Sequence, residues 1–469
     1  MGLKTFTIDF AEYTKHQYLR FDEKFWHTTK NIAVYDFILL KNVFNLVNGN
    51  SYTEYYTEEK TDIPYIRIGD LTVRFEIDDK NIIYLDDSIE LNEDKILKED
   101  DLILATIGAT IGKINLARDF KGGTFSNNTI LLRLKDKKNH NSYFYEKLLQ
   151  TNLLQKYIWG VVSQKAQPNL QTYDLENVKI PLIPKSKQDQ IVSQIEPIEK
   201  KIKELKAQIT PPQEVINKVF AREFGFDLEN ADEKKKNMIH YSSLIDVANE
   251  ELKFDISLKY RFIFNKYVKN PSKNDWIELG KIVEVKGGKR LPKGQNITEE
   301  DTGFKYVRVD DLSWSGIFDL ENIKYISEEN HKKIKNYISK ENDILLTIVG
   351  ATVGKCGLVP LELDGENITE NFARLIILDK EKYLPEYINY CLQSKTSVYQ
   401  IDEYKGRSSQ GKLALFRIKK IKIPNIKSEL QQKIVDEIKA ELDKQEEIKS
   451  KIESERNKID EIIEKAIKI

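Results

Sequence analysis

The 469-residue sequence has few of the residues that build disulfide frameworks and metal centres. It contains two cysteines, Cys356 and Cys391, and five histidines. Two cysteines cannot form a disulfide framework or a cysteine zinc site, and they fit a reducing cytoplasm. The histidines are scattered, and none pairs with a cysteine at metal-ligand spacing. The sequence therefore predicts no metal site.

Long hydrophobic runs and an excess of charge of one sign are also missing. No run approaches 18 apolar residues, and no apolar core follows a basic N-terminal start, so we expect a soluble, cytoplasmic chain without a membrane partner. The 74 basic and 75 acidic residues nearly cancel. A chain that binds nucleic acid alone usually has a basic excess. The balance argues against a uniformly basic surface but permits local basic grooves.

Catalytic motifs are the third absence. No Gly-x-Gly-x-x-Gly follows a predicted strand, and the Asn/Asp-Pro-Pro-aromatic motif of adenine methyltransferases is missing, since the only Pro-Pro is Pro211-Pro212. Gly108–Lys113 and Gly350–Lys355 resemble a phosphate-binding P-loop. However, three rather than four residues separate the glycines, and neither Ser nor Thr follows the lysine. We expect no catalytic residues in this chain.

The most informative feature that is present is a duplication. Residues 98–113 read KEDDLILATIGATIGK, and residues 340–355 read KENDILLTIVGATVGK, with identity at nine of 16 positions. The match continues through the Ile-Pro pairs at 180–181 and 423–424 and through Gln188 and Gln431. Two copies indicate two similar ligand sites or two halves of one site.

Short hydrophobic runs between Gly, Asn and Asp turns predict strands at 65–68, 102–107, 129–134 and 178–181, and helical spacing predicts a helix over 143–159. The repeated glycine-lysine segment then has two interpretations. It is either a tight turn that glycine permits after a strand, or a loop whose lysine, Lys113 or Lys355, contacts a DNA phosphate. Both stay open.

After each globular segment the apolar residues recur at the heptad spacing of a coiled-coil helix, with alternating steps of four and three residues in the first segment. A narrow apolar stripe cannot be buried by one helix alone, so we expect the two stripes to pack on each other in an antiparallel pair. Pro197 predicts a kink or a late helix start, and Gly225 predicts a helix end. The stripe residues are Ile191, Ile195, Ile198, Ile202, Leu205 and Ile209 in the first segment, and Ile434, Ile438, Leu442, Ile448, Ile452 and Ile459 in the second.

These patterns predict an α+β protein in which two similar globular α/β domains are separated by two long antiparallel helices and related by an internal pseudo-two-fold repeat. The predicted boundaries are 1–185 for the first domain, 186–225 for the first helical spacer, 226–425 for the second domain and 426–469 for the second helical spacer.

Polar loops at matching places in the two copies carry side chains that reach base edges and phosphates. A solvated loop is the alternative interpretation for any single residue. Framework residues agree between the copies while loop residues differ, as expected if two domains read different sequences. The candidate DNA-contacting residues are Asn50, Lys113, Gln164, Lys165, Gln167, Lys286, Lys289, Arg290, Lys355, Arg407, Ser408, Ser409, Gln410 and Lys412.

The doubled order of these motifs resembles the specificity subunit of type I restriction–modification systems. The motifs are an Asp-Leu/Ile-Leu run into Gly-x-x-x-Gly-Lys, a Gln-x-x-Leu loop, an Ile-Pro stop and a Gln-x-x-Ile-Val helix start. One departure is that the glutamate common at the family's helix start is missing from 187–190 and 430–433. The resemblance covers essentially the whole chain. It implies two non-catalytic target-recognition domains, each reading half of a split DNA site, with helices that set the gap.

The resemblance also implies partners and their cofactors. These are double-stranded DNA, two methyltransferase subunits that bind S-adenosylmethionine and, in a full restriction complex, two restriction subunits that use ATP and Mg²⁺. This chain itself is expected to hold no cofactor. Two other classes stay open: a coiled-coil adaptor with two peptide-binding lobes, and a P-loop-like nucleotide-binding enzyme, which the missing motifs disfavour. The DNA target and its spacer length do not follow from the sequence.

Overall fold

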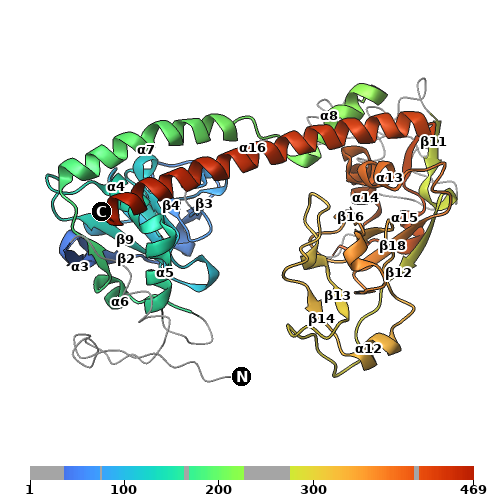
Figure 1. Ribbon diagram of the computed structural model, residues 1–469, viewed down its shortest axis with the longest axis horizontal. Coiled ribbons are helices and arrows are strands. Elements are labelled where there is room, and N and C mark those ends of the chain that lie inside the picture. Colours follow the sequence, from blue (N-terminus) through green and yellow to red (C-terminus); the bar gives the residue numbers. More distant parts are fainter. Residues whose placement is uncertain (1–35, 74–75, 163–167, 227–274, 406–410, 469) are drawn as a thin grey trace. The chain divides into compact units, whose positions relative to one another are not determined.

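The computed structural model describes residues 36–73, 76–162, 168–226, 275–405 and 411–468 (Figure 1). The chain divides into two compact units. Unit 1 comprises residues 1–208 and 448–469, and unit 2 comprises residues 209–447. Both contain sheets and helices, so the predicted class, α+β with two similar domains, is confirmed. The division falls inside both predicted helical spacers, and each unit therefore receives part of each spacer.

The central sheet of unit 1 is antiparallel, with the order β2 (Phe44–Asn48), β9 (Thr129–Leu134), β6 (Leu102–Ala105) and β7 (Ile114–Leu116). All four residues of β6 are buried. Leu102 and Leu104 belong to one hydrophobic cluster, and Ile103 and Ala105 belong to another. Because side chains alternate between the faces of a strand, β6 is covered on both faces. This explains why its sequence is continuously apolar rather than alternating.

Smaller sheets complete the globular part of unit 1. A second sheet has the order β3 (Tyr56–Thr57), β5 (Ile83–Leu85), β4 (Pro64–Ile66) and β8 (Thr124–Phe125), in which β4 and β8 are parallel. β1 (Phe37–Leu39) pairs with β10 (Lys179–Pro181). This last pair joins the two ends of the globular part, directly before the first spacer helix. The shorter helices are α3 (Leu40–Val43), α4 (Ser142–Gln150), α5 (Asn152–Val161) and α6 (Thr172–Glu176).

Unit 2 repeats this plan. Its central sheet has the order β12 (Val283–Gly287), β18 (Phe372–Ile377), β15 (Ile344–Thr347) and β16 (Cys356–Leu358), which matches β2, β9, β6 and β7. β14 (Lys324–Tyr325), β13 (Lys305–Val307) and β17 (Asn367–Ile368) form the second sheet, and β11 (Asp275–Glu278) pairs with β19 (Lys422–Asn425). Its shorter helices are α12 (Glu328–Lys333), α13 (Pro385–Gln393), α14 (Lys395–Tyr404) and α15 (Leu415–Ile418).

Single turns of 3₁₀ helix connect many of these elements. They are η1 (Thr53–Tyr55), η2 (Asp79–Asn81), η3 (Glu93–Lys95), η4 (Gly108–Thr110) and η5 (Arg118–Phe120) in unit 1, and η7 (Leu279–Lys281), η8 (Val309–Asp311) and η9 (Leu361–Leu363) in unit 2.

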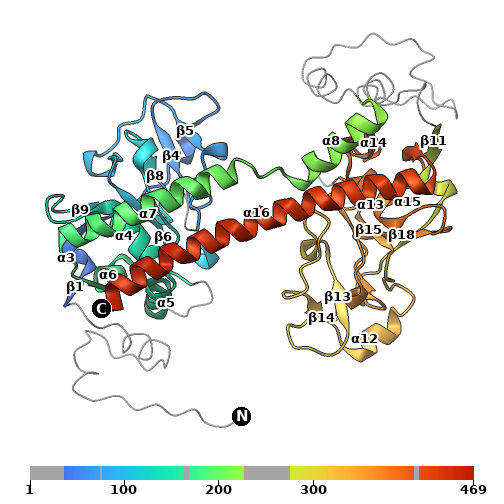
Figure 2. The same ribbon diagram turned by 45° about the horizontal axis from the view of Figure 1, so that its top comes forward.

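In unit 1, α7 (Lys185–Lys206) and the end of α16 (Ser428–Lys468) run antiparallel and side by side (Figures 1 and 2). The Nζ of Lys201 donates to Glu455 Oε1 at 2.7 Å. Ile191 and Ile195 of the apolar stripe belong to the core of the domain, and Ile459 packs against that core, so the stripes do not pack on each other alone. Stripe residues Ile191, Ile195, Ile202 and Ile452 are buried, and Ile198, Leu205, Ile448 and Ile459 are half-buried.

In unit 2, α8 (Pro212–Phe224) packs antiparallel to the first half of α16. Arg222 pairs with Glu437 at 2.5 Å, and the N–H of Thr210 donates to Gln445 Oε1 at 2.8 Å. Gly225 ends α8 in the left-handed conformation, with φ 68°, as the sequence predicted. The stripe again belongs to the domain core, where Ile434 and Ile438 are buried, while Leu442 and Ile209 are half-buried.

Two helix predictions differ from the structure. The single helix expected over 143–159 is divided into α4 and α5, because Thr151 is extended (φ −63°, ψ 148°) and its side chain caps α5 by accepting from the N–H of Leu154. α7 also continues through Pro197, which is exposed and inside the helix, so the late start is wrong, while the alternative, a kink at Pro197, stays a prediction. The segment 207–211 separates α7 from α8, and Pro211 and Pro212 stand at the N-cap and first position of α8. α16 contains no proline and is continuous over 41 residues.

A fully buried glutamine fastens each spacer helix to its domain. Gln188 accepts from the N–H of Asn141 at 2.9 Å and donates to the carbonyl of Ile183 at 2.7 Å. Gln431 accepts from the N–H of Leu384 at 2.9 Å and donates to the carbonyl of Ile426 at 2.8 Å. Since both ends of each amide have partners, the polar group is buried without an unpaired atom. The duplicated Gln-x-x-Ile-Val motif is therefore an anchor.

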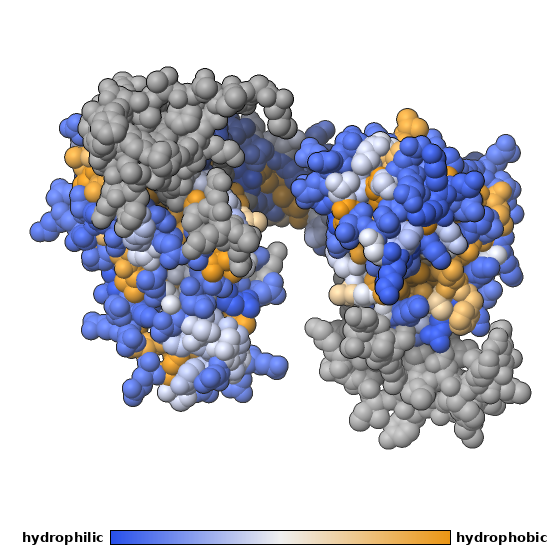
Figure 3. Space-filling view, turned by 90° about the horizontal axis from the view of Figure 1, so that it is seen from below, coloured by the Kyte–Doolittle hydropathy of each residue, from blue (hydrophilic) through white to orange (hydrophobic). Residues whose placement is uncertain are grey.

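The described ranges contain neither a helix that could cross a membrane nor a group of side chains that could hold a metal ion. None of the helices there is long and apolar enough to cross a membrane. The same residues include no group of three or more His, Cys, Asp and Glu side chains placed to hold a metal ion. Figure 3 shows a face on which hydrophilic residues predominate and hydrophobic residues form small separate groups.

The glutamine anchor leads to a stability prediction. Gln188→Ala removes the partner of the half-buried N–H of Asn141 and of the buried carbonyl of Ile183, so we expect it to lower the free energy of unfolding by about 1–3 kcal/mol. Gln190→Ala, an exposed position on the same helix, should change it by less than about 0.5 kcal/mol. Urea denaturation followed by circular dichroism measures both. Equal effects of the two substitutions would contradict the anchor.

Candidate nucleic-acid interface

The duplicated glycine-lysine segment forms the turn after the central strand in each unit. After β6, Gly108 and Gly112 have φ angles of 65° and 86°, and after β15 both Gly350 and Gly354 have a φ of 100°. L-residues with side chains rarely adopt such angles, so these positions require glycine. The turn then returns to pair as β7 or β16. The tight-turn interpretation therefore accounts for the glycines without a phosphate ligand.

The lysine of each segment is engaged within its own unit. Lys113 Nζ donates to the carbonyl of Leu71 at 3.1 Å, and Lys355 Nζ donates to the carbonyl of Val309 at 2.6 Å. Lys355 is only 7% exposed, and burial lowers its pKa. A side chain so placed fixes the turn to the neighbouring loop. This favours the structural role for Lys355, and the phosphate contacts proposed for both lysines stay predictions.

The glycine-lysine turn also binds residues at or directly after the end of each predicted polar loop, 168–169 in unit 1 and 411–412 in unit 2. In unit 1 Ile107 bridges Asn169, and the N–H of Gly108 donates to the carbonyl of Pro168 at 3.0 Å. In unit 2 Val349 bridges Lys412, and the N–H of Gly350 donates to the carbonyl of Gly411 at 3.1 Å. Two segments that lie far apart in the sequence thus meet at the same end of each central sheet.

A third segment reaches this end through a close backbone approach. A Cβ on Gly49 would lie 2.0 Å from the carbonyl oxygen of Ser126, and a Cβ on Gly288 would lie 2.1 Å from that of Thr369. No side chain fits there, so both glycines are required. The residues after them are held in the same way, because the hydroxyl of Tyr65 donates to the carbonyl of Asn50 and that of Tyr306 to the carbonyl of Lys289, both at 2.8 Å.

We call this end of each central sheet the strand-end rim. It consists of three neighbouring pieces: the loop after the first sheet strand, the turn before β9 or β18, and the segment that crosses the glycine-lysine turn. The pieces are joined through the backbone, since Thr106 donates to the carbonyl of Asn128 at 3.1 Å and Ile348 donates to that of Asn371 at 2.8 Å. The rim residues are Asn50, Ser51, Asn127, Asn128 and Asn169 in unit 1, and Lys289, Arg290, Glu370, Asn371 and Lys412 in unit 2.

The structure brings several of the predicted DNA-contacting residues together on these rims. Asn50 lies on the first rim, and Lys289, Arg290 and Lys412 lie on the second, all three exposed. Lys286 is exposed on β12 and pairs with Glu284 at 3.0 Å. The remaining candidates, Gln164, Lys165, Gln167, Arg407, Ser408, Ser409 and Gln410, lie outside the described residues.

Sequence reasoning missed the turn that supplies the middle of each rim. Asn127 is exposed beside Asn128, and the equivalent Glu370 stands beside Asn371. The match of Asn128 with Asn371 was visible in the repeat, but the sequence does not show that this turn lies between the two loops. The steric requirement at Gly49 and Gly288 is the signal that places it there.

In both units a buried ion pair links one strand of the central sheet, β9 or β18, to the aspartate just before the neighbouring strand, β6 or β15. Arg133 contacts both oxygens of Asp101, at 2.9 and 2.6 Å, and Arg374 Nε contacts Asp343 Oδ2. Both carboxylates are 2% exposed. The aspartates are equivalent in the repeat, but the arginines are not. Arg374 occupies the register position of Leu131, two residues before Arg133 in the equivalent strand. The ion pair is therefore duplicated in space while its arginine is shifted in sequence.

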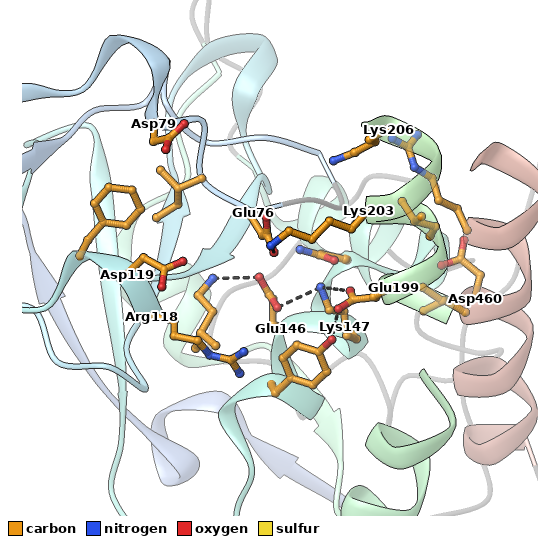
Figure 4. Close-up of a pocket in the computed structure, with 18 residues that line it drawn as sticks. Glu76, Asp79, Arg118, Asp119, Glu146, Lys147, Glu199, Lys203, Lys206 and Asp460 are labelled. Carbon is orange, nitrogen blue, oxygen red and sulfur yellow. Dashed lines mark hydrogen bonds and ion pairs between the residues drawn. The ribbon is translucent and has the colours of Figure 1, made fainter. Parts of the chain in front are cut away.

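Unit 1 also contains a charged cavity, of about 490 Å³, between the domain and its spacer helices (Figure 4). Lys147 lies at its centre and contacts Glu146 at 3.0 Å and Glu199 at 2.7 Å. The hydroxyl of Tyr143 also contacts Glu199. Burial, followed by the charge of Glu76, raises the pKa of Glu199 to about 7 against the opposing effects of Arg118 and Lys206. The cluster joins α4 to α7 and takes no part in the rim.

The close approach at the second rim predicts a contrast between adjacent glycines. Gly288→Ala forces the backbone of the loop away from Thr369, so we expect a loss of about 1–3 kcal/mol in the free energy of unfolding. Gly287→Ala places its Cβ 3.6 Å from Leu415, an ordinary contact, and should cost less than about 0.5 kcal/mol. Thermal and urea denaturation of the two variants provide the comparison. Equal losses of unfolding free energy for Gly288→Ala and Gly287→Ala would contradict the close approach at Gly288.

The charged cavity predicts a dependence of stability on pH. Folding raises the pKa of Glu199, so the folded chain holds this proton more tightly than the unfolded chain. The resulting stabilisation is complete below about pH 4.5 and is lost as the pH rises to about 7. We expect Glu199→Gln to flatten the fall in unfolding free energy over this range, measured by urea denaturation at a series of pH values. Glu196→Gln, exposed on the same helix, serves as the control, and an unchanged profile for Glu199→Gln would refute the assignment.

Comparison with known proteins gives a consistent result. The family model for the type I restriction modification DNA specificity domain matches residues 35–211 and 271–457, which together exceed half of the chain. The chain is 24% identical, over 378 residues, to the type I restriction enzyme MjaVIII specificity subunit of Methanocaldococcus jannaschii, covering 78% of this chain and 79% of that one.

Two solved structures cover nearly the full length. The S subunit of a type I restriction–modification system from M. genitalium is 18% identical, with a TM-score of 0.39 over 93% of this chain and 96% of that one. The HsdS subunit from Thermoanaerobacter tengcongensis is 14% identical, with a TM-score of 0.32 over 92% and 96%. Because the family model matches both halves of the duplicated fold, the chain belongs to the DNA specificity subunits of type I restriction–modification systems, which recognise DNA and are not themselves catalytic.

Proposed function

We propose that this chain reads a bipartite DNA sequence, with one unit for each half-site. The observation that carries the proposal is the pair of strand-end rims. Both are built on the same backbone, with a glycine that excludes any side chain and a loop root held by the glycine-lysine turn. Their side chains, which are exposed or half-buried, nevertheless differ at four of five matched positions. A shared frame with different polar side chains is what two readers of different sequences require.

We further propose that the spacer helices scaffold two methyltransferase subunits, one for each unit. α7 with the end of α16, and α8 with the start of α16, form two equivalent antiparallel pairs, each built into the core of its own unit. Equivalent helix pairs offer equivalent surfaces to two copies of one partner. S-adenosylmethionine would then bind to the methyltransferase subunits, and ATP with Mg²⁺ to restriction subunits where these are present, and this chain would supply only recognition.

Methylation sequencing tests the reading function. The chain is assembled with its methyltransferase partner and exposed to a library of randomised duplexes. We expect methylated adenines within two fixed half-sites separated by a spacer of constant length and free sequence. A single continuous motif would contradict the two-reader arrangement, and methylation without sequence preference would contradict recognition by this chain.

Spacer length gives a sharper prediction. Seven residues, two helical turns, are inserted into α16 after Glu447, together with seven residues in the segment 207–211 that links α7 to α8. Two turns add about 10.5 Å along a helix, and one base pair rises about 3.4 Å, so the spacer should lengthen by roughly three base pairs. Methylation sequencing of the insertion variant measures the change. Half-sites that stay intact at the original spacing would show that the helices do not set the gap.

A further inference from the structure

The two rims differ in one property that bears on which bases they read. At matched positions unit 1 has Ser51 and Asn127, where unit 2 has Arg290 and Glu370. Among the described residues, the rim of unit 1 presents amides and a hydroxyl, and Lys95 beside it donates from Nζ to Asn50 Oδ1. Unit 2 presents the cations Lys289, Arg290 and Lys412 with the single carboxylate of Glu370. The second rim is thus the more cationic one and the only one with an arginine among the described residues.

Arg290 has the placement of a side chain that contacts a ligand. It is 80% exposed, and its Nε donates to Glu370 Oε1 at 2.5 Å. An ion pair with such an exposed arginine adds little to stability, so its main effect is to orient the guanidinium of Arg290. The carboxylate is fixed in turn, because the hydroxyl of Thr369 donates to Glu370 Oε2 at 3.0 Å. Thr369 is the residue whose carbonyl closes against Gly288.

These contacts connect the guanidinium to the close backbone approach at Gly288. Gly288 lies against the carbonyl of Thr369, the hydroxyl of Thr369 donates to Glu370, and Glu370 accepts from Arg290. With Nε taken by a carboxylate, the two terminal nitrogens of a guanidinium still form a fork. Such a fork matches O6 and N7 of guanine in the major groove, the commonest specific contact between an arginine and DNA. An ammonium lacks this paired geometry.

We infer that Arg290, positioned by Glu370, reads a guanine in the half-site recognised by unit 2. The inference rests on the proposed reading function and adds to it a residue and a base. At the matched position of unit 1 the side chain is Ser51, which cannot offer a bidentate fork. The two half-sites therefore differ in how they are read, by a guanidinium in one and by amides and hydroxyls in the other.

The test uses the chain assembled with its methyltransferase partner and methylation sequencing over a randomised library. Arg290→Ala should relax a single guanine position in one half-site by about 5- to 100-fold in discrimination and leave the other half-site unchanged. Arg290→Lys, which keeps the charge but removes the fork, should relax the same position. Glu370→Gln should give an intermediate loss there, because the fork is less well held. Lys340→Ala removes an exposed cation that also pairs with a carboxylate, Asp364, and should leave the motif intact.

The outcomes that would overturn the inference are distinct. Uniformly weaker methylation of all sequences by Arg290→Ala, restored by Arg290→Lys, would make Arg290 a phosphate contact. Relaxation of a base other than guanine, of positions in both half-sites, or of none would also refute it. If the unaltered chain gives no bipartite motif, the proposed function fails as well. A clear bipartite motif that Arg290→Ala does not change refutes this inference alone.

Discussion

The arrangement of each unit depends on a buried amide at the start of its spacer helix. Gln188 and Gln431 are both fully buried. Each accepts from the backbone N–H of the residue before α4 or α13, and each donates to the carbonyl two residues before the spacer helix, α7 or α16. A buried amide tolerates only the geometry that satisfies both of its ends. It therefore fixes the direction in which the long helix leaves the domain, and the apolar stripe then follows into the core.

The strand-end rims also depend on a geometry that both units share. The features that the two units share lie in the backbone, where Gly49 and Gly288 permit a close approach that any Cβ would prevent. The features that differ are exposed or half-buried side chains on that frame. A duplicated recognition protein can change what it reads without disturbing its fold if variation is confined to such side chains. The pair of exposed Arg290 with half-buried Glu370, and the matched residues Ser51 and Asn127, follow this division.

Much of this could be predicted from the sequence, because duplication makes equivalent residues visible. The repeat identified the glycine turns, the anchoring glutamines and the helical stripes. It could not reveal the shifted arginine, since Arg374 replaces Leu131 rather than Arg133 and only strand register relates the two ion pairs. Nor could it reveal the buried contact of Lys147 with Glu199, because charged residues at helical spacing usually lie on a solvated face. The break at Thr151 was hidden by apolar residues that continue across it.

The central claim is that one chain carries two interchangeable readers. The most direct measurement replaces residues 275–426 by a second copy of residues 36–183, which also begin at the closing strand pair and end before a spacer helix. Methylation sequencing of this chimera with its partner should show the first half-site on both sides of the spacer and no trace of the second. Retention of the original second half-site, or a motif unrelated to the first, would contradict the account.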